Sequence, residues 1–544
     1  MLKNLLIKRY NIYSGMDIKY GNISICVDPA KIVPQELDKL NPDLILVSHE
    51  SMDHMDPIQI YQLQKRKNCK IFCNIAAAVD LIQYFPQDIE FIDSINTMLP
   101  NSTIYYKNLK ITAILSKHCD YMLPVIFRLD FLESGYSILH CIDTLIYDDL
   151  DAAAKDVNLC IIPIGIAKGV DAQLGMQFIE KLKSPTYLVN HFTNQNKEFK
   201  TLVAGSQNLK QKNIKIFFTD WNESCEIPVN SVKKSNITVH ENKFSKISCS
   251  EICELLNSSE NLKNDLIALL AELNTRKSEI MKESLILCLG KLYKGTSREC
   301  KSLILIILSV LSLYDGYLVG KNKNFIDLLL TDLKEPVNTS NEELKSSILF
   351  FLGVFSQQSA QICQSHLESL VLNAGISNEH VTYWVVECLG RMCASESTYS
   401  DDAVEALLEI VKQPELFNSV IVRRRIFWEF CRLIRRKPSL GSVFIEYFVD
   451  GLEDTNPDVR LLAELCIGIS SRACDILNEN VMEKFIKLSE DEEDDVREIF
   501  VRCWIIINRY HPAIGNKYKD KVKNLLRDPN CHVKLAATEA FEKE

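Results

Sequence analysis

The chain has 544 residues, of which 47% are hydrophobic and 25% charged, and its formal net charge at pH 7 is −10. This composition excludes a largely disordered protein, and the length exceeds what one hydrophobic core supports, so several domains are expected. The acidic balance argues against a general nucleic-acid coat. The 19 cysteines include no Cys-x-x-Cys pair and often lie inside apolar runs, which predicts reduced thiols and a cytoplasmic location.

We expect neither a targeting segment nor a membrane span. The apolar stretch at the N-terminus is brief and is interrupted by Lys3. The longest apolar run, Leu303 to Leu313, is shorter than the ~20 residues that cross a bilayer. The sequence therefore predicts a soluble protein with no membrane partner.

A polar stretch rich in potential ligands follows an apolar run early in the chain. Leu44 to Val47 is unbroken in its apolar character and predicts a buried strand, after which His49, Asp53 and His54 follow closely. A loop at a strand end holds side chains on a rigid support, which favours a metal or catalytic site. The alternative is an ordinary polar surface loop.

Three more predicted strands end next to a residue type that binds metal ions. Residues 109–115 precede His118, residues 136–142 precede Asp143, and residues 187–190 precede His191. Imidazole and carboxylate are ligands that suit zinc, iron or manganese. Four strand ends of this kind favour a metal site over a chance polar loop.

With these residues the sequence resembles the metallo-β-lactamase superfamily, and within it the L-ascorbate-6-phosphate lactonase and related metal-dependent hydrolases. The family motif His-x-His-x-Asp-His, its isolated His, its bridging Asp and its final His match His49, Asp53, His54, His118, Asp143 and His191. Supporting matches are Cys26-Val27-Asp28-Pro29 and Ile162-Pro163-Ile164-Gly165. The resemblance covers roughly the first 225 residues and implies a four-layer αββα sandwich with the metals at one edge of its two sheets.

Two positions depart from the family pattern. Ser51 stands where the family has its second His, and Ile142 stands where it has Gly before the bridging Asp. The resemblance then leaves the first metal only His49, His118 and Asp143, because a serine hydroxyl is a poor zinc ligand. The second metal keeps its whole set, which is Asp53, His54, Asp143 and His191. We therefore expect one tightly bound divalent ion rather than two, zinc first, with manganese or iron as alternatives.

Residues beside these ligands have simpler expected roles. We expect Asp56 to support the metal loop. Three residues before Asp143, His140 is expected to point to the opposite face of the sheet and to serve packing. Cys119 and Asp120 are alternatives for the missing ligand.

The domain organisation follows from a change of periodicity. Residues 1–228 alternate predicted strands with short helices, residues 229–248 are polar and lack periodicity, and residues 249–544 fit the helical period almost throughout. We therefore predict a hydrolase domain, a linker and an all-α domain.

The helical part contains a repeat. Val422-Arg423, Val459-Arg460, Val496-Arg497 and Val533-Lys534 recur at 459 − 422 = 37, 496 − 459 = 37 and 533 − 496 = 37. A fixed period of this length is typical of stacked helical hairpins. The segment resembles HEAT repeats, in which Asp and then Val-Arg open the second helix, and it predicts a solenoid that binds a protein partner. A helical domain without repeats is the alternative, and the repeat is blurred from about 249 to 340.

A run of arginines begins one of these repeats. Arg425, Arg432 and Arg436 fall at helical spacing and are a candidate anion-binding stripe. The favoured alternative is a solvated helix face that complements the acidic run Glu490 to Asp495. A nucleic-acid partner is therefore open but not favoured.

These expectations combine into one function and one alternative. The resemblance implies a hydrolase in which metal-bound hydroxide, oriented by the catalytic Asp53, attacks a small phosphorylated or cyclic ester, or a phosphodiester. The alternative is a hydrolase fold that has lost turnover and serves as a binding scaffold. Ser51 and Ile142 favour the scaffold, while Asp53, His54, Asp143 and His191 favour the enzyme.

Overall fold

The computed structural model describes residues 4–11, 13–117, 122–164, 172–190, 196–219, 223–229, 242–320, 323–338, 341–357, 378–394 and 400–542. The chain divides into two compact units, Met1–Gly295 and Thr296–Glu544. The first unit thus includes helices beyond residue 249, where the sequence led us to place the start of the helical domain. The limits 1–228, 229–248 and 249–544 as independently folding parts remain a prediction.

Two seven-stranded sheets form the first unit. The first sheet is ordered β14 (Ser224–Ile227), β1 (Leu5–Arg9), β2 (Met16–Tyr20), β3 (Ile23–Val27), β4 (Leu44–Val47), β5 (Lys70–Cys73) and β6 (Ile95–Thr97). The second is ordered β13 (Lys215–Phe218), β12 (Thr186–Asn190), β11 (Leu159–Pro163), β10 (Tyr136–His140), β9 (Val125–Phe131), β8 (Leu109–Leu115) and β7 (Thr103–Tyr106). Both sheets are mixed: β14 to β3 and β7 to β10 pair antiparallel, whereas β3 to β6 and β10 to β13 pair parallel.

One hydrophobic core contains apolar side chains from both sheets. Alternation sets which side chains enter it: in β8, Leu109, Ile111 and Ala113 are buried while the residues between them are partly exposed. The strands β4 and β11 are buried at every position, as expected for parallel strands that are covered on both faces. The sheets therefore act as a rigid base for the loops at their ends.

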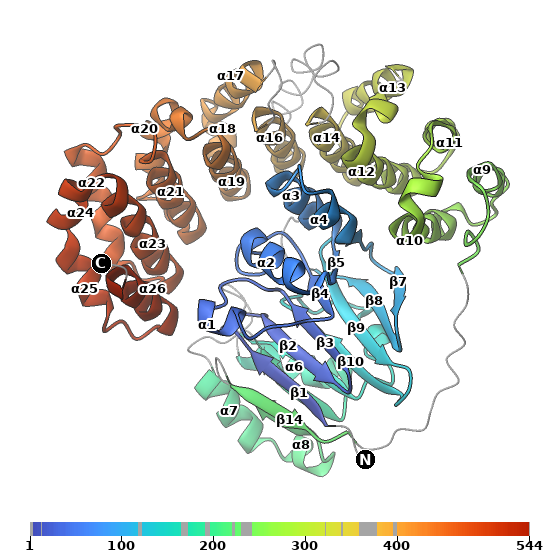
Figure 1. Ribbon diagram of the computed structural model, residues 1–544, viewed down its shortest axis with the longest axis horizontal. Helices are drawn as coiled ribbons and strands as arrows, with labels where there is room; N and C mark the ends of the chain where they lie inside the picture. Colours follow the sequence, from blue (N-terminus) through green and yellow to red (C-terminus); the bar gives the residue numbers. More distant parts are fainter. Residues whose placement is uncertain are drawn as a thin grey trace. The chain divides into compact units, whose positions relative to one another are not determined.

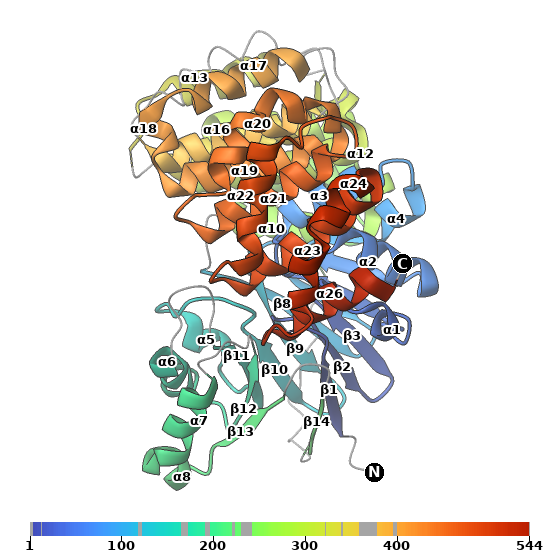
Figure 2. The same ribbon diagram turned by 90° about the vertical axis from the view of Figure 1, so that its left-hand side faces the viewer.

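Helices cover the outer faces of the sheets. The helices α1 (Pro34–Leu37), α2 (Pro57–Lys67), α3 (Ile75–Tyr84) and α4 (Ile89–Ser94) lie beside the first sheet (Figure 1). The helices α5 (Leu150–Ala153), α6 (Ala172–Leu182), α7 (Asn196–Gly205) and α8 (Gln207–Gln211) lie beside the second (Figure 2). Two mixed sheets with flanking helices fit the sandwich that the sequence predicts.

Three further helices belong to the first unit, namely α9 (Cys249–Asn257), α10 (Leu262–Ile280) and α11 (Glu283–Gly295). The helix α10 contacts the edge strand β6 through Asn274. The Thr97 amide donates to Asn274 Oδ1 at 3.0 Å, and Asn274 Nδ2 donates to the Thr97 carbonyl at 2.6 Å. The side-chain amide thus pairs with an edge that would otherwise offer unpaired backbone groups.

The second unit is helical wherever the structure describes regular elements. Its helices are α12 (Arg298–Gly320), α13 (Lys323–Lys334), α14 (Glu342–Ser356), α16 (Glu379–Cys393), α17 (Ser400–Val411), α18 (Pro414–Phe417), α19 (Val420–Arg436), α20 (Gly441–Gly451), α21 (Pro457–Ser470), α22 (Glu479–Lys487), α23 (Asp494–Tyr510), α24 (Pro512–Lys517), α25 (Lys519–Leu525) and α26 (Cys531–Glu542), with short 3₁₀ turns at Pro438–Leu440 and Leu488–Glu490. A row of neighbours in contact runs α12, α14, α16, α19, α21, α23 and α26 in chain order (Figure 1). None of the helices described is both long and apolar enough to cross a membrane.

The predicted 37-residue spacing reappears as the spacing of helix starts. The helices α19, α21, α23 and α26 begin at residues 420, 457, 494 and 531, so that each step is 37 residues. Side-chain oxygens cap three of these starts. Ser419 accepts from the Val422 amide, and Asn456 accepts from the amides of Asp458 and Val459. Asn530 accepts from the amides of His532 and Val533 before α26. The spacing, rather than a particular repeat type, is what the structure shows.

A ladder of Arg–Asp pairs connects successive repeats. Each Arg reaches the Asp that lies 31 residues further on, in the pairs Arg423–Asp454, Arg460–Asp491 and Arg497–Asp528. In the middle pair, Arg460 Nε and Nη2 donate to the two Asp491 oxygens at 2.7 and 2.8 Å. The Arg460 Nη1 atom also donates to the Asp454 carbonyl at 2.9 Å. Paired, forked contacts of this kind fix both distance and orientation between neighbouring repeats.

Candidate metal centre

A short loop after β4 positions two of the predicted ligands. It contains His49 and His54, and a tight turn shapes it, because the amides of His54 and Met55 both donate to the Ser51 carbonyl, at 3.0 and 2.7 Å. The loop ends at Asp56, whose carboxylate accepts from the Ile58 and Gln59 amides and caps α2. The local sequence therefore holds both histidines by backbone hydrogen bonds and by a helix cap.

The third ligand comes from the second sheet. Asp143 follows β10, and the residue before it, Ile142, has φ 53°, in the left-handed region. This conformation lets the Ile142 amide donate to His140 Nδ1 at 3.1 Å. The hydroxyl of Thr144 accepts from the Lys117 amide at 2.8 Å, which connects this loop to the end of β8. Asp143 is thus fixed from both sides.

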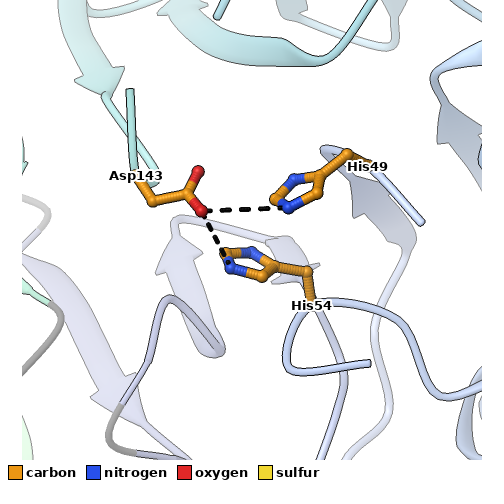
Figure 3. A group of neighbouring side chains, drawn as sticks. All are labelled: His49, His54 and Asp143. Carbon is orange, nitrogen blue, oxygen red and sulfur yellow. Dashed lines mark ion pairs between the residues drawn. The ribbon is translucent and has the colours of Figure 1, made fainter. Parts of the chain in front are cut away.

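The three side chains converge from two sheets (Figure 3). The Asp143 Oδ2 atom lies 3.2 Å from His54 Nε2 and 3.8 Å from His49 Nε2. All three are buried, and one ligand atom from each lies within 4.8 Å of the others. Among the residues that the structure describes, this is the one group of three or more His, Cys, Asp or Glu side chains with that geometry.

A buried carboxylate behind the histidines sets their orientation. Asp28 accepts from His54 Nδ1 at 2.9 Å, from the Ser14 hydroxyl at 2.7 Å, and from the Ser48 amide and hydroxyl at 2.8 and 2.9 Å. The Ser48 hydroxyl also lies 2.9 Å from His49 Nδ1. Because Ser48 donates to Asp28, its oxygen accepts from His49. In the neutral form that binds a metal, both rings would therefore carry their proton on Nδ1, with the Nε2 lone pairs directed toward Asp143.

The charges around this network shift two pKa values. Burial opposes ionisation of Asp28, but the hydrogen bond and charge of His54, with His49 and the Ser48 amide, lower the pKa of this carboxyl. Burial also disfavours a charged His54, yet the carboxylates of Asp53, Asp143 and Asp28 raise the pKa of this imidazole well above its usual value. The carboxylates thus create a strong preference for positive charge at His54 Nε2, and a cation satisfies that preference as a proton does.

The donor set fits a divalent ion. Ligand atoms about 2.1 Å from a tetrahedral ion lie about 3.4 Å apart. The separations of 3.2 and 3.8 Å between the carboxylate and the two imidazoles are close to that value. Two neutral imidazoles and a carboxylate are typical ligands of zinc sites. In such sites the second ring nitrogen of each imidazole is bonded to a fixed acceptor. His49, His54 and Asp143 would therefore hold the ion.

Other residues of the predicted site have separate positions. Asp53 is half-buried beside the cluster, and its Oδ2 lies 3.4 Å from His54 Nε2. The Ser51 hydroxyl donates to Asp53 Oδ1, so its described contact is to a neighbouring carboxylate. His118 and His191, as well as Cys119, Asp120 and Gly165, lie outside the described residues.

Sequence reasoning missed the roles of Asp28, Ser14 and Ser48. Asp28 was singled out only as part of the Cys26–Pro29 match. Its position at the end of β3, next to the strand that carries the histidines, is the signal that could have found it, because β3 and β4 are parallel neighbours. Ser14 belongs to the turn between β1 and β2, and no local pattern connects it to a histidine 40 residues away.

The candidate anion-binding stripe requires a correction. Arg425 is buried and pairs with Glu387 at 2.8 Å and Glu429 at 2.7 Å, and Arg432 pairs with Glu429 at 2.6 Å. Arg436 donates to the Ala394 carbonyl at 2.8 Å. Arg436 is exposed, but Arg425 and Arg432 are withdrawn from solvent, so the three arginines do not form one exposed stripe. Carboxylates of a neighbouring helix and of α19 itself neutralise Arg425 and Arg432 inside the helical unit.

Part of the chain is similar to proteins that are named metal-dependent hydrolases. No family model matches the chain. A UPF0173 metal-dependent hydrolase of Thermoplasma acidophilum is 27% identical over 188 residues, which span 32% of this chain and 77% of that protein. Among solved structures, the chain is similar to a metallo hydrolase of Ignicoccus hospitalis, Igni18, with a TM-score of 0.35, 16% identity, and coverage of 42% of this chain and 100% of that one. A metallo-β-lactamase fold protein of Bacillus subtilis, YhfI, gives a TM-score of 0.33 and 16% identity over 41% of this chain and 99% of that one. Proteins related to the N-terminal part of the chain are thus named metal-dependent hydrolases, and the chain carries a His/His/Asp cluster.

Proposed function

We propose that the protein hydrolyses an ester-type substrate at a divalent ion, zinc in the first place, held by His49, His54 and Asp143. The observation that carries the proposal is the convergence of the three side chains, with both histidines oriented from behind by Asp28 and Ser48. A divalent ion bound there lowers the pKa of a water molecule to about 7 and supplies hydroxide at neutral pH. Such a site suits hydrolysis without any further cofactor.

The residues of the chain have distinct parts in this proposal. Asp28 keeps His54 in one tautomer, and Ser48 does the same for His49. Asp53, half-buried at the edge of the cluster, is the group placed to orient the attacking water and to accept its proton. Ser51 holds Asp53 in position through its hydroxyl. We propose one ion at this cluster rather than two, because Ser51 contacts a carboxylate where the family has an imidazole ligand.

The finer assignments are also proposals. We infer a small phosphorylated or cyclic ester as the substrate, as in the L-ascorbate-6-phosphate lactonase branch, with phosphodiesters second. The cysteines that the structure describes are free thiols, which supports a cytoplasmic location. We further infer that the helical unit is a HEAT-like stack that binds a protein partner. The 37-residue spacing of helix starts and the Arg–Asp ladder support this assignment.

A substrate panel with two matched variants tests the activity. The zinc-loaded protein should hydrolyse at least one member of a panel of nitrophenyl phosphoesters, a nitrophenyl phosphodiester and small lactones. Asp53→Ala should lower kcat/KM by ~10²-fold or more, because it removes a positioned group. Ser51→Ala removes only the hydrogen bond to Asp53 and should cost less than ~10-fold. A protein that holds zinc and hydrolyses nothing in the panel would instead support the binding scaffold.

A further inference from the structure

Three cysteines gather between two helices of the first unit, away from the His/Asp cluster. Cys249 and Cys253 lie one turn apart on α9, and Ser284 and Cys288 lie one turn apart on α11. Residues four apart share a helix face, and α9 packs against α11. The two helices therefore present two facing pairs, each with at least one thiol.

The contacts show that the two pairs are in register. Cys249 Sγ lies 3.2 Å from the Ser284 hydroxyl, and Cys253 Sγ lies 3.7 Å from the Ser284 carbonyl. Cys288 Sγ lies 3.8 Å from the Cys253 carbonyl, back across the same interface. The three sulfur atoms do not all lie within 4.8 Å of one another. The Cys253 and Cys288 thiols interact with backbone carbonyls, so rotation about their side-chain bonds is enough to redirect these sulfurs.

The group is open to solvent on one side. Cys253 is half-buried and Ser284 is exposed, whereas Cys249 and Cys288 are each 6% exposed. Burial, together with the neighbouring Cys288 and Cys249 thiols, raises the pKa of Cys253 well above its usual value. The raised pKa of Cys253 disfavours its thiolate in the metal-free protein, and a soft cation that replaces the proton would remove this cost.

We propose that Cys249, Cys253 and Cys288 form a binding site for a thiophilic divalent ion, zinc in the cell, with the Ser284 hydroxyl or a water as the fourth ligand. Three thiolates and one oxygen are a ligand set that zinc accepts in tetrahedral geometry. The bound ion would connect α9 to α11, since each helix supplies ligands. The thiols Cys431 and Cys466 in the helical unit lie 3.3 Å apart, but they are 4% and 0% exposed and so lack a half-buried member such as Cys253.

Cobalt substitution of the reduced full-length protein tests this site. Cobalt bound to thiolates gives a sulfur-to-metal charge-transfer absorption, whereas cobalt at His49, His54 and Asp143 does not. We expect this absorption to saturate at one cobalt per chain and to be lost in Cys253→Ala and Cys288→Ala. It should persist in His54→Ala. It should also persist in Cys474→Ala, a control thiol that is likewise half-buried and bonded to backbone carbonyls.

Alkylation of the wild type gives a second test that requires no variant. Zinc should slow modification of Cys253 by a small thiol reagent at least 10-fold, measured peptide by peptide, and should leave Cys474 unaffected. The proposal is overturned by an absorption that is absent or that survives in both Cys253→Ala and Cys288→Ala. Equal alkylation rates of Cys253 with and without zinc would overturn it as well.

Discussion

At Ile142 the chain adopts a backbone conformation that β-branched residues rarely accept. Its φ is 53°, its side chain is only 1% exposed, and its amide donates to His140 next to the ligand Asp143. The left-handed conformation costs a residue with a Cβ atom roughly 1–2 kcal/mol. The buried side chain offsets this cost through its contacts in the core. A glycine would form this turn without strain, but Ile142 forms it and packs its side chain in the core.

At this position a glycine variant should be more stable than an alanine variant, which is the reverse of the usual order of stability. Ile142→Gly and Ile142→Ala both lose the buried side chain, but only glycine relieves the strained φ. We therefore expect Ile142→Gly to be more stable than Ile142→Ala by about 1 kcal/mol, as measured by chemical denaturation. At Ile138, a regular strand position of β10, the same pair should show the opposite order. An alanine variant more stable than the glycine variant at residue 142 would contradict the strain.

Part of the candidate metal cluster was predictable from the sequence, because two of its side chains follow shortly after apolar runs that form strands. His49 and Asp143 are examples, and the chain order of their strands brings them to one edge. Side chains whose role depends on distant partners were not predictable. Asp28 was quoted without a function, and Arg425 was assigned to a surface although Glu387 of α16 lies beside it in the fold. Charge runs in one segment cannot show which carboxylates another segment supplies.

Between successive helical repeats, the Arg–Asp pairs have a defined orientation. Arg460 and Asp491 are 10% and 7% exposed as side chains, so the pair is largely removed from water. The hydrogen bonds that Arg460 donates to Asp491 raise the pKa of Arg460. Arg460 also donates to the Asp454 carbonyl, and Asp491 accepts from the Glu493 amide. The spacing of these arginines was visible in the sequence, but their partners were not.

Removing one arginine of the ladder should be costly. Arg460→Ala leaves the Asp491 carboxylate with little solvent access and should lower the free energy of unfolding by about 1.5–3 kcal/mol. Arg424→Ala is the matched control, since Arg424 pairs with Asp458 at 3.0 Å but their side chains are 33% and 53% exposed. This surface pair should be worth less than about 1 kcal/mol. Similar losses of unfolding free energy in both variants would show that the ladder pair stabilises the fold no more than a surface pair does.

The buried carboxyl of Glu464 on α21 should make the stability of the protein depend on pH. It is fully buried, and its oxygens have no hydrogen-bond partner among the described residues. Burial, aided by Asp491 and opposed by Arg460, raises its pKa well above the model-peptide value of 4.5. Because the folded state holds this proton more tightly, its contribution to stability is full below about pH 4.5 and falls as the pH rises.

Glu464→Gln removes this dependence, because an amide does not titrate. The wild type and the variant should have similar stability near pH 4.5. By pH 8 the variant should be more stable by at least about 1 kcal/mol, since one pKa unit corresponds to about 1.4 kcal/mol. Denaturation curves across this range measure the difference. A difference between the two proteins that does not change with pH would contradict a raised pKa in the folded state.

At the scale of the whole chain, the sequence shows where strand periodicity gives way to helical periodicity, whereas the two compact units divide after Gly295. The loss of periodicity near residue 229 marks the end of the sandwich strands, since β14 ends at Ile227. The helices that follow still belong to the first unit, in which Asn274 pairs with the edge strand β6. Helical periodicity alone cannot show whether a helix packs on a sheet or on other helices.

The metal content of the full-length protein tests the central claim most directly. Wild type and His54→Ala are loaded with zinc, dialysed, and compared by elemental analysis, with His380→Ala, an exposed histidine of α16, as the control. The comparison uses the difference between proteins, because the thiols of α9 and α11 can hold a further ion. We predict that the wild type and His380→Ala each retain one ion per chain more than His54→Ala, which loses a ligand of the His49, His54 and Asp143 cluster. Equal zinc content in wild type and a folded His54→Ala would contradict a metal centre at this position.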